Sequence, residues 1–260
     1  MSLPATQKPF ALDQYIMHHI TDSNQWQLPF LPLIHLPGFL TIQKVVLLLA
    51  AVLMVVVFCF LYRKNDRVPK GLTNLLEVFI VHIRNDLAME FLGEKDGHRL
   101  TPLFLTFFFF ILFLNILGLI PIFPTTATAS VSVTGALAFL TFTLMTVGGM
   151  VRHGFLNYMK IFVLPGVPAP LLVLLTPLEI LSLFIKSAAL MIRLFANMFA
   201  GHIVILSILG LVVVLGVFAL PAVVLAVLVS VLEVFVAFLQ AYIFTFLSII
   251  FISQIYHPSH

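Results

Sequence analysis

Four ionisable side chains interrupt an otherwise apolar stretch that runs from residue 179 to residue 202. They are Glu179, Lys186, Arg193 and His202. A charged side chain at the centre of a bilayer costs roughly 2.5–3.5 kcal/mol on insertion scales, so such residues normally face a protein partner or a water-filled path. Histidine titrates near neutral pH, and a neighbouring cation changes the proton affinity of a carboxyl group. These residue types therefore indicate proton or ion chemistry inside a membrane.

Helix geometry divides these side chains between two faces. At about 100° per residue, steps of seven residues return to nearly the same azimuth, so Glu179, Lys186 and Arg193 form one polar stripe. Asn197, four residues after Arg193, lies beside that stripe, whereas His202 points about 180° away. One helix is therefore expected to present two functional faces.

A later apolar stretch carries two more polar side chains, Glu233 and Gln240, which are seven residues apart and hence lie on about one face of a helix. If the two helices form an antiparallel hairpin, nearly the same register places Arg193 level with Gln240 and His202 level with Glu233. The spacing therefore predicts two polar layers, one at mid-membrane and one nearer the outside.

The run RLFANMFAGH, which ends at His202, resembles subunit a of the rotary F-type ATP synthase. The resemblance covers most of the chain from about Val45 onward. The polar residues that accompany the run are Glu179 and Lys186 upstream, and Glu233 and Gln240 on the later helix. This resemblance implies a proton-translocating stator subunit with two offset half-channels and an arginine that couples proton flow to ring rotation.

By this resemblance, Arg193 is the catalytic residue. A carboxylic acid that faces lipid stays protonated, but an opposite charge within ~4–6 Å lowers its pKa by about 1–3 units. Arg193 is always charged, so each ring carboxyl that passes it would release its proton. His202 and Glu233 then suit an outer access channel, and the cytoplasmic route lies at the other half of the first helix. The implied proton path comprises His202, Glu233, Asn197, Gln240, Glu179 and Lys186.

Each of these residues also has a structural interpretation. Lys186 could snorkel toward the cytoplasmic interface, and Glu179 could favour the dipole of a helix that starts near Pro177. Asn197 and Gln240 could join helices by hydrogen bonds. Arg193 could belong to a purely structural ion pair.

The resemblance further implies partners and a location. The partners are the c-subunit rotor ring, peripheral-stalk subunit b, the remainder of the ATP synthase and membrane lipid, and the location is the bacterial plasma membrane. The chain is expected to be no enzyme by itself and to need no cofactor, since it has no Gly-rich nucleotide loop. His18, His19 and His35 do not predict a metal site, because suitable Cys or carboxylate ligands are missing near them. The net charge of +3 does not indicate nucleic-acid binding, because most basic residues lie in loops beside spans.

Two rival functions are a self-contained ion-coupled secondary transporter or channel, and a purely structural membrane scaffold. Secondary transporters often show internal repeats with paired broken helices. No convincing repeat is present, and the buried charges crowd into the C-terminal third of the sequence. A scaffold would not need them.

Composition sets the fold class. The 260 residues are 62% hydrophobic and 9% charged, which excludes an ordinary soluble domain. Continuous apolar runs favour helices over the alternating pattern of a transmembrane barrel. We therefore predict an all-α integral membrane protein with five transmembrane helices and one amphipathic surface helix, the last two helices being long, tilted and antiparallel. The single cysteine, Cys59, lies inside an apolar run and is expected to be a packing residue.

Charged segments mark the boundaries between the predicted parts of the first half of the chain. Residues 1–44 are expected to form an external tail, 45–62 the first transmembrane helix, and 63–100 a cytoplasmic segment. Four basic residues directly after the first span place that end inside and the N-terminus outside. Apolar residues at three- and four-residue steps predict an amphipathic helix at about 69–92, on the membrane surface or as a soluble-facing connector. A charged loop is expected at 94–99.

The second half contains two hairpins. Residues 101–151 carry no charge and are too long for one crossing, so they are predicted to form a transmembrane hairpin that turns at 121–130. Residues 152–170 form a cytoplasmic linker.

The last hairpin, 171–256, is predicted to face the rotor ring and to leave the C-terminus in the cytoplasm. Its helices are expected at about 171–208 and 221–255. They would be roughly 55 Å long against a hydrocarbon core of ~30 Å, and therefore tilted.

Overall fold

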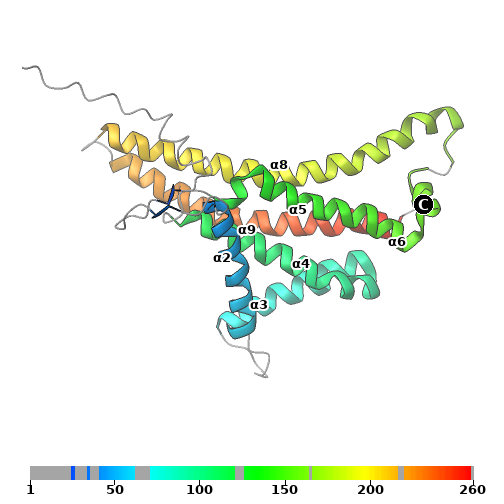
Figure 1. Ribbon diagram of the computed structural model, residues 1–260, viewed down its shortest axis with the longest axis horizontal. Coiled ribbons are helices and arrows are strands. Elements are labelled where there is room, and N and C mark those ends of the chain that lie inside the picture. Colours follow the sequence, from blue (N-terminus) through cyan, green and yellow to red (C-terminus); the bar gives the residue numbers. More distant parts are fainter. Residues whose placement is uncertain are drawn as a thin grey trace, which may run out of the picture.

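The computed structural model describes residues 25–26, 34–35, 41–61, 71–120, 126–163, 166–215 and 220–258. Within them the chain is almost entirely helical (Figure 1). Three π-helical segments, η1, η2 and η4, continue the α-helices that precede them. The elements are β1 (Gln25–Trp26), β2 (Ile34–His35), α2 (Ile42–Val56), η1 (Val57–Leu61), α3 (Leu72–Val81), η2 (His82–Met89), α4 (Glu90–Leu119), η3 (Ala127–Ala129), α5 (Val131–Thr143), η4 (Leu144–Gly148), α6 (Gly149–His153), α7 (Phe155–Ile161), α8 (Ala169–Leu215) and α9 (Leu220–Tyr256).

Five stretches of helix are long and apolar enough to cross a membrane, which confirms the predicted fold class. They are Ile42–Cys59, Thr73–Leu119, Val131–His153, Pro170–Val212 and Leu220–Tyr256. The predicted tail contributes the two-residue strands β1 and β2, which pair antiparallel. His18 and His19 lie outside the described residues. Cys59 is exposed, so its predicted packing role is wrong.

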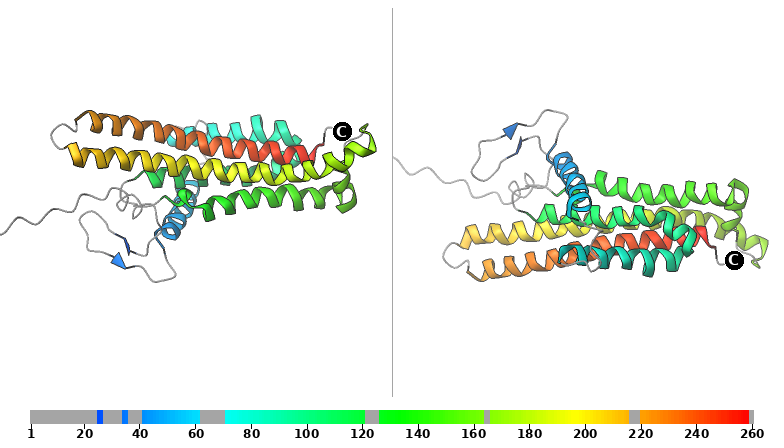
Figure 2. Two further views of the ribbon diagram at one scale, coloured as in Figure 1. Left: turned by 90° about the horizontal axis from the view of Figure 1, so that it is seen from above. Right: turned by 90° about the horizontal axis from the view of Figure 1, so that it is seen from below.

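The last two helices form the predicted long antiparallel hairpin. Figure 2 shows α8 and α9 side by side along the length of the bundle. They contain 47 and 37 residues, or roughly 70 and 55 Å at 1.5 Å per residue, far more than a perpendicular crossing needs. The prediction ended α8 too early, because the apolar sequence continues without a proline to Leu215. Pro177 lies inside α8, which is bowed in Figure 1.

A sharp reversal at Gly93 folds α3 and η2 back against α4. Gly93 has φ 74° and ψ 168°, a conformation that glycine adopts without steric cost. The two helices approach closely, since a Cβ on Gly97 would lie 2.7 Å from the Ala88 carbonyl oxygen. The predicted loop at residues 94–99 is therefore wrong: a single glycine makes the turn, and the charged residues occupy the first turns of α4.

The predicted amphipathic helix is present, and its apolar stripe packs on protein. Leu76, Ile83 and Leu87 are 5%, 1% and 5% exposed. The Phe79 ring lies 5.5 Å from the Phe108 ring on α4 and contacts α9 through Phe238. On the opposite side of α3, Leu75, Val78 and Val81 are exposed.

The core lies between α4 and α9. Phe107, Phe108 and Phe109 are at most 2% exposed, as expected for a packing surface. The Phe107 ring packs edge-on against Phe244 of α9, with 5.7 Å between ring centroids. Helix α4 ends at Leu119 and α5 begins at Val131, so the predicted break between these spans is observed.

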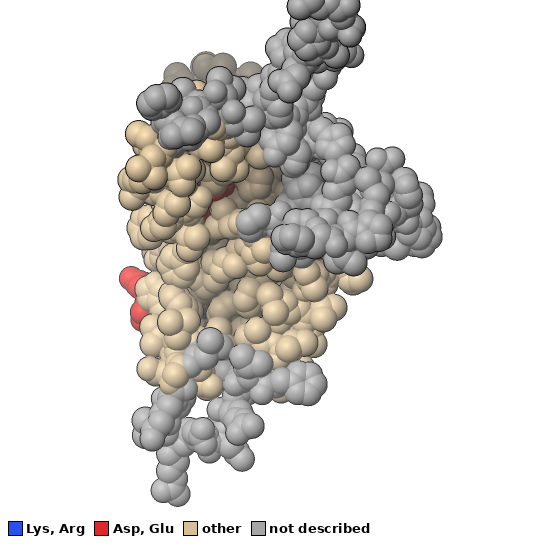
Figure 3. Space-filling view, turned by 90° about the vertical axis from the view of Figure 1, so that its left-hand side faces the viewer, with Lys and Arg blue, Asp and Glu red and all other residues tan. Residues whose placement is uncertain are grey.

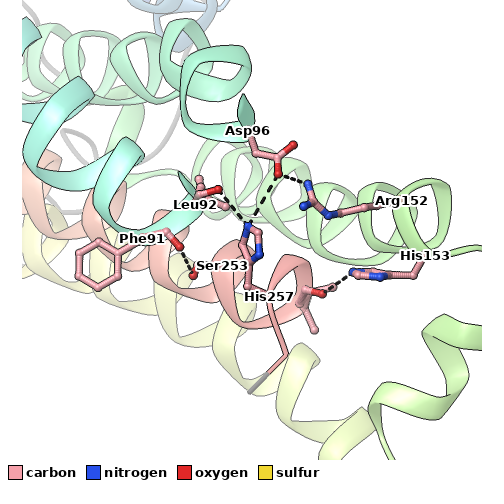
Figure 4. Close-up of polar contacts among 8 residues, drawn as sticks. Phe91, Leu92, Asp96, Arg152, His153, Ser253 and His257 are labelled. Atoms are coloured by element: carbon pink, nitrogen blue, oxygen red, sulfur yellow. Dashed lines mark hydrogen bonds and ion pairs between the residues drawn. The ribbon is translucent and has the colours of Figure 1, made fainter. Parts of the chain in front are cut away.

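Polar contacts fasten the C-terminal end of α9 to α4 and α6 (Figure 4). Arg152 of α6 donates to the Asp96 carboxylate of α4. His257 Nε2 lies 2.9 Å from the Leu92 carbonyl oxygen and 3.7 Å from Asp96 Oδ2. We call Asp96, Arg152 and His257 the C-terminal clasp. Two further contacts run from Ser253 Oγ to the Phe91 carbonyl oxygen and from His153 Nε2 to the Ile255 carbonyl oxygen.

Candidate functional site

Helices α8 and α9 bring His202 and Glu233 together, which confirms the predicted register of these two residues. His202 Nδ1 lies 3.4 Å from Glu233 Oε1. The two side chains are 17% and 5% exposed. Within the part of the chain that is described, neither carboxylate oxygen nor His202 Nδ1 makes a hydrogen bond. Buried polar groups normally have a partner, so this pair has spare capacity for water or for a proton.

Gly201 leaves room for the carboxyl group of Glu233 between the two helices. A Cβ at this position would collide with Glu233 Oε1. The sequence analysis did not select Gly201, although a glycine inside a helix costs roughly 1 kcal/mol relative to alanine and so indicates a packing or functional reason. That cost was the signal that could have identified it.

A third helix contributes Asn115, which the sequence analysis also missed. Asn115 lies on α4, is fully buried, and donates from Nδ2 to the Ala237 carbonyl oxygen at 3.2 Å. Ala237 is one turn beyond Glu233 on α9. Asn115 Oδ1 has no partner among the described residues. An uncharged span gave no reason to single out this amide, because only its tertiary position makes it unusual.

The two predicted amide residues, Gln240 and Asn197, differ in burial. Gln240 is 5% exposed, and its Nε2 makes no hydrogen bond within the described ranges. Asn197 is half-buried. No hydrogen bond from either side chain to the described part of the facing helix is present, which does not support the interpretation that they join helices.

Arg193 lies on the outside of the hairpin. It is exposed, and its guanidinium has neither an ion pair nor a hydrogen bond with any residue that the structure describes. The neighbouring Ile192 is 56% exposed, so the surroundings are apolar. A structural ion pair within the described chain is therefore absent. A cation on an apolar helix face requires a partner or water supplied from outside the chain.

Lys186 is held by α9. Its Nζ donates to Gln254 Oε1 at 2.8 Å and lies 5.8 Å from the centre of the Phe251 ring. Glu179 is half-buried on α8, and its carboxylate has no partner within the described ranges. Helix α8 begins at Ala169, well before Glu179, so the helix-dipole interpretation is wrong: the dipole effect falls off within the first turn.

Few charged side chains are visible among the described residues at the end of the molecule where α8 ends and α9 begins. Figure 3 shows this face with acidic side chains at only a few places, one of them inside a hollow, and no lysine or arginine among the residues described there. The C-terminal clasp lies at the other end of the bundle. The bundle is therefore asymmetric in charge along its length.

Comparison with known proteins identifies the family. A family model described as ATP synthase A chain matches residues 44–253. The chain belongs to this family.

Individual members of the family are similar over most of this chain. ATP synthase subunit a of Chloroherpeton thalassium is 38% identical over 261 residues, covering 94% of this chain and 77% of that protein. The subunit of Anaeromyxobacter dehalogenans strain 2CP-C is 47% identical over 217 residues, covering 82% and 56%. The chain spans about half the length of the Anaeromyxobacter relatives that it matches.

Proposed function

We propose that this chain is the proton-translocating stator subunit of the membrane sector of an F-type ATP synthase. The observation that carries the proposal is Arg193, which is exposed on an apolar face of a member of this family and has no ion pair or hydrogen bond with the described residues. The relatives named above are each called ATP synthase subunit a. In this function Arg193 acts on groups that the chain does not itself contain.

Arg193 couples proton flow to rotation. As each ring carboxyl reaches the guanidinium, the permanent positive charge favours the carboxylate, because an opposite charge within ~4–6 Å lowers a carboxyl pKa by about 1–3 units. The proton must then leave, and it cannot pass Arg193 directly. Rotation becomes obligatory for transport.

The outer access path uses the buried layer at His202 and Glu233. An imidazole and a carboxyl group 3.4 Å apart can exchange a proton through a small shift or one water molecule. Asn115 and Gln240 have polar atoms without hydrogen-bond partners among the described residues, and these atoms can bind water farther along the path. The membrane potential supplies ~2.3 kcal/mol per charge per 100 mV.

The cytoplasmic path lies at the other half of α8. Glu179 offers a carboxylate that has no partner in the described part of the chain, on the same helix as Arg193. Lys186 donates to Gln254 and so places a cation on the same half of the helix. Protons leave the ring on this side.

The partners follow from the exposed surface of the hairpin. Large apolar side chains cover one face of α8 and α9, and two such helices can lie along a cylindrical ring of c subunits. Representative members are Ile185, Ile192, Leu228, Val231 and Phe235. The remaining partners are peripheral-stalk subunit b, the rest of the complex and lipid. The location is the bacterial plasma membrane, with the N-terminus outside and the C-terminus in the cytoplasm.

The decisive experiment replaces Arg193 by alanine in the whole complex and measures ATP-driven proton pumping in membrane vesicles. We expect pumping to vanish while the subunit still assembles with the ring. Lys160→Ala, which removes an exposed cation from α7, is the matched control and keeps normal pumping. Normal coupling in Arg193→Ala would refute the proposal.

A second measurement distinguishes the transporter alternative. The chain reconstituted alone in liposomes should carry no ion flux, because it supplies no ring carboxylates. Ion-coupled transport by the chain alone would favour a self-contained transporter or channel instead.

A further inference from the structure

The interior face of α9 changes character at Gln240. In the part of α9 that precedes Ala241, Glu233 and Gln240 are buried and have polar atoms that lack hydrogen-bond partners among the described residues. Beyond Gln240 the buried positions of this helix carry no such atom as far as Ile255. The buried members of this second group are Ala241, Phe244, Thr245, Ser248, Ile249, Ile252 and Ile255, each 4% exposed or less.

The two hydroxyl groups within this second group are already satisfied. Thr245 Oγ1 donates to the Ala241 carbonyl oxygen at 2.9 Å, and Ser248 Oγ donates to the Phe244 carbonyl oxygen at 2.8 Å. Ser248 Oγ also lies 3.3 Å from Thr141 Oγ1 of α5. These hydroxyls therefore have little capacity left to hold a chain of water molecules.

Phe244 is the first large side chain beyond Gln240 on this face. It is one turn further along α9 and is fully buried. Its ring meets the Phe107 ring of α4 edge-on, at 87° and 5.7 Å between centroids. Aromatic pairs in this geometry are tightly packed, and voids lined by apolar side chains stay dry.

We propose that the interior face of α9 from Phe244 to Ile255 is a dry seal that ends the outer proton path at Gln240. This inference rests on the proposed function, because a seal matters only if protons enter the layer at Glu233. Two polar contacts to other helices lie between Gln240 and Ser253, the Ser248–Thr141 hydroxyl pair and the half-buried Tyr242 hydroxyl, 3.4 Å from His82 Nε2. The next such contact is made by Ser253, about 20 Å of helix beyond Gln240. Protons in the outer path therefore cannot pass through the protein interior to the C-terminal end of α9, and they must transfer to the ring.

The first test places a polar side chain of similar length inside the seal. We expect Phe244→Gln to raise the passive proton leak of vesicles carrying the whole complex several-fold, because the introduced amide can hydrogen-bond water next to Gln240. Phe244→Leu keeps the site apolar and should not leak. Phe246→Gln is the matched control, since Phe246 lies on the same helix, half-buried, with its ring against Tyr242.

A second variant distinguishes an opened path from a generally damaged protein. If the leak of Phe244→Gln is fed from the outer layer, adding Glu233→Gln should return it toward the wild-type leak. A leak that is insensitive to Glu233→Gln would overturn the proposal. Should Phe244→Gln fail to assemble, Ile252→Gln tests the same seal closer to the C-terminal end, where the same Glu233 dependence is expected.

The seal and the proposed function fail in distinguishable ways. Assembled Phe244→Gln and Ile252→Gln complexes without added leak, together with loss of pumping in Arg193→Ala, would overturn the seal alone. Normal pumping in Arg193→Ala would overturn the proposed function whatever the leak of the Phe244 variants.

Discussion

Two histidine–carboxylate neighbours in this chain have opposite surroundings. In the layer between α8 and α9, Glu233 is buried and His202 is half-buried. They lie 3.4 Å apart and make no hydrogen bonds among the described residues. In the C-terminal clasp, His257 lies 3.7 Å from Asp96, but Asp96 is paired with Arg152 and His257 bonds to a carbonyl oxygen. The polar atoms of the first pair are free to bind water, whereas those of the second pair already have partners.

This difference separates two uses of charge in a membrane protein. A buried polar group that remains unpaired lowers the stability of the fold, so two ionisable groups left unpaired side by side, as at His202 and Glu233, indicate function. A paired and partly exposed group contributes a modest amount to stability and fastens helix ends together. The two regions therefore predict mutational effects of different kinds.

The largest effect is expected at Glu233. Positioned proton-transfer groups typically contribute roughly 10²–10⁴-fold to a rate, so Glu233→Gln should lower ATP-driven proton pumping by at least about tenfold. Asp96→Asn is the same type of change in the C-terminal clasp and should keep most of the pumping. Equal losses in the two variants would remove the distinction between the regions.

A smaller effect on pumping is expected at Gly201. Alanine is the better helix former by roughly 1 kcal/mol, but its Cβ would displace the Glu233 carboxyl group. We expect Gly201→Ala to assemble normally and to pump several-fold more slowly, as measured by acidification of inverted vesicles.

Gly135→Ala is the control for this substitution. Its Cβ would lie 3.4 Å from the Met191 sulfur atom, an ordinary contact, so pumping should be unchanged. Unaltered pumping in both variants would mean that the carboxyl position is not critical.

The long apolar helices were predictable from the sequence because hydrophobic periodicity and composition indicate them directly. The hairpin of α8 and α9 and the five apolar spans follow from the length and composition of the apolar runs, and the meeting of His202 with Glu233 follows from their spacing. The turn at Gly93 was not foreseen, because four charged residues and a histidine follow it and favoured a loop, and the positive φ of this glycine is visible only in three dimensions.

The site was only partly predictable for a related reason. Charged residues inside apolar runs are conspicuous, so Arg193 and Glu233 were found. Asn115 and Gln254 are single amides whose partners are 122 and 68 residues away in the sequence. Tertiary contacts of that separation leave no local pattern.

A modest effect on stability is expected in the C-terminal clasp. Asp96→Asn removes the charge that accepts from Arg152, and pairs of this partly exposed kind are worth up to about 1 kcal/mol. We expect slightly lower thermal stability and faster proteolysis near His257, with pumping retained. Exchanging the two charges, Asp96→Arg with Arg152→Asp, should restore part of the protection. Proteolysis that is unchanged in Asp96→Asn would show that the clasp does not hold the end of α9.

The smallest effect is expected for Tyr158→Phe. This substitution is also the strictest test of the difference between the His202–Glu233 layer and the C-terminal clasp, because Tyr158 is a buried polar residue at the clasp end of the bundle. It is 1% exposed, and its hydroxyl has no partner within the described residues. Burial raises the pKa of the Tyr158 phenol above its ordinary value of 10.0, so the neutral form is favoured in the fold.

The sign of the pH dependence follows from that direction. The contribution to stability is complete below the pKa of the unfolded chain, about 10, and is lost as pH rises through the folded pKa. Tyr158→Phe should therefore pump normally, be at least as stable as wild type at pH 8, and lose less stability by pH 11 in thermal unfolding of the solubilised complex. A loss of pumping in Tyr158→Phe would place this hydroxyl in a proton path, and unpaired burial would then mark function at both ends of the bundle.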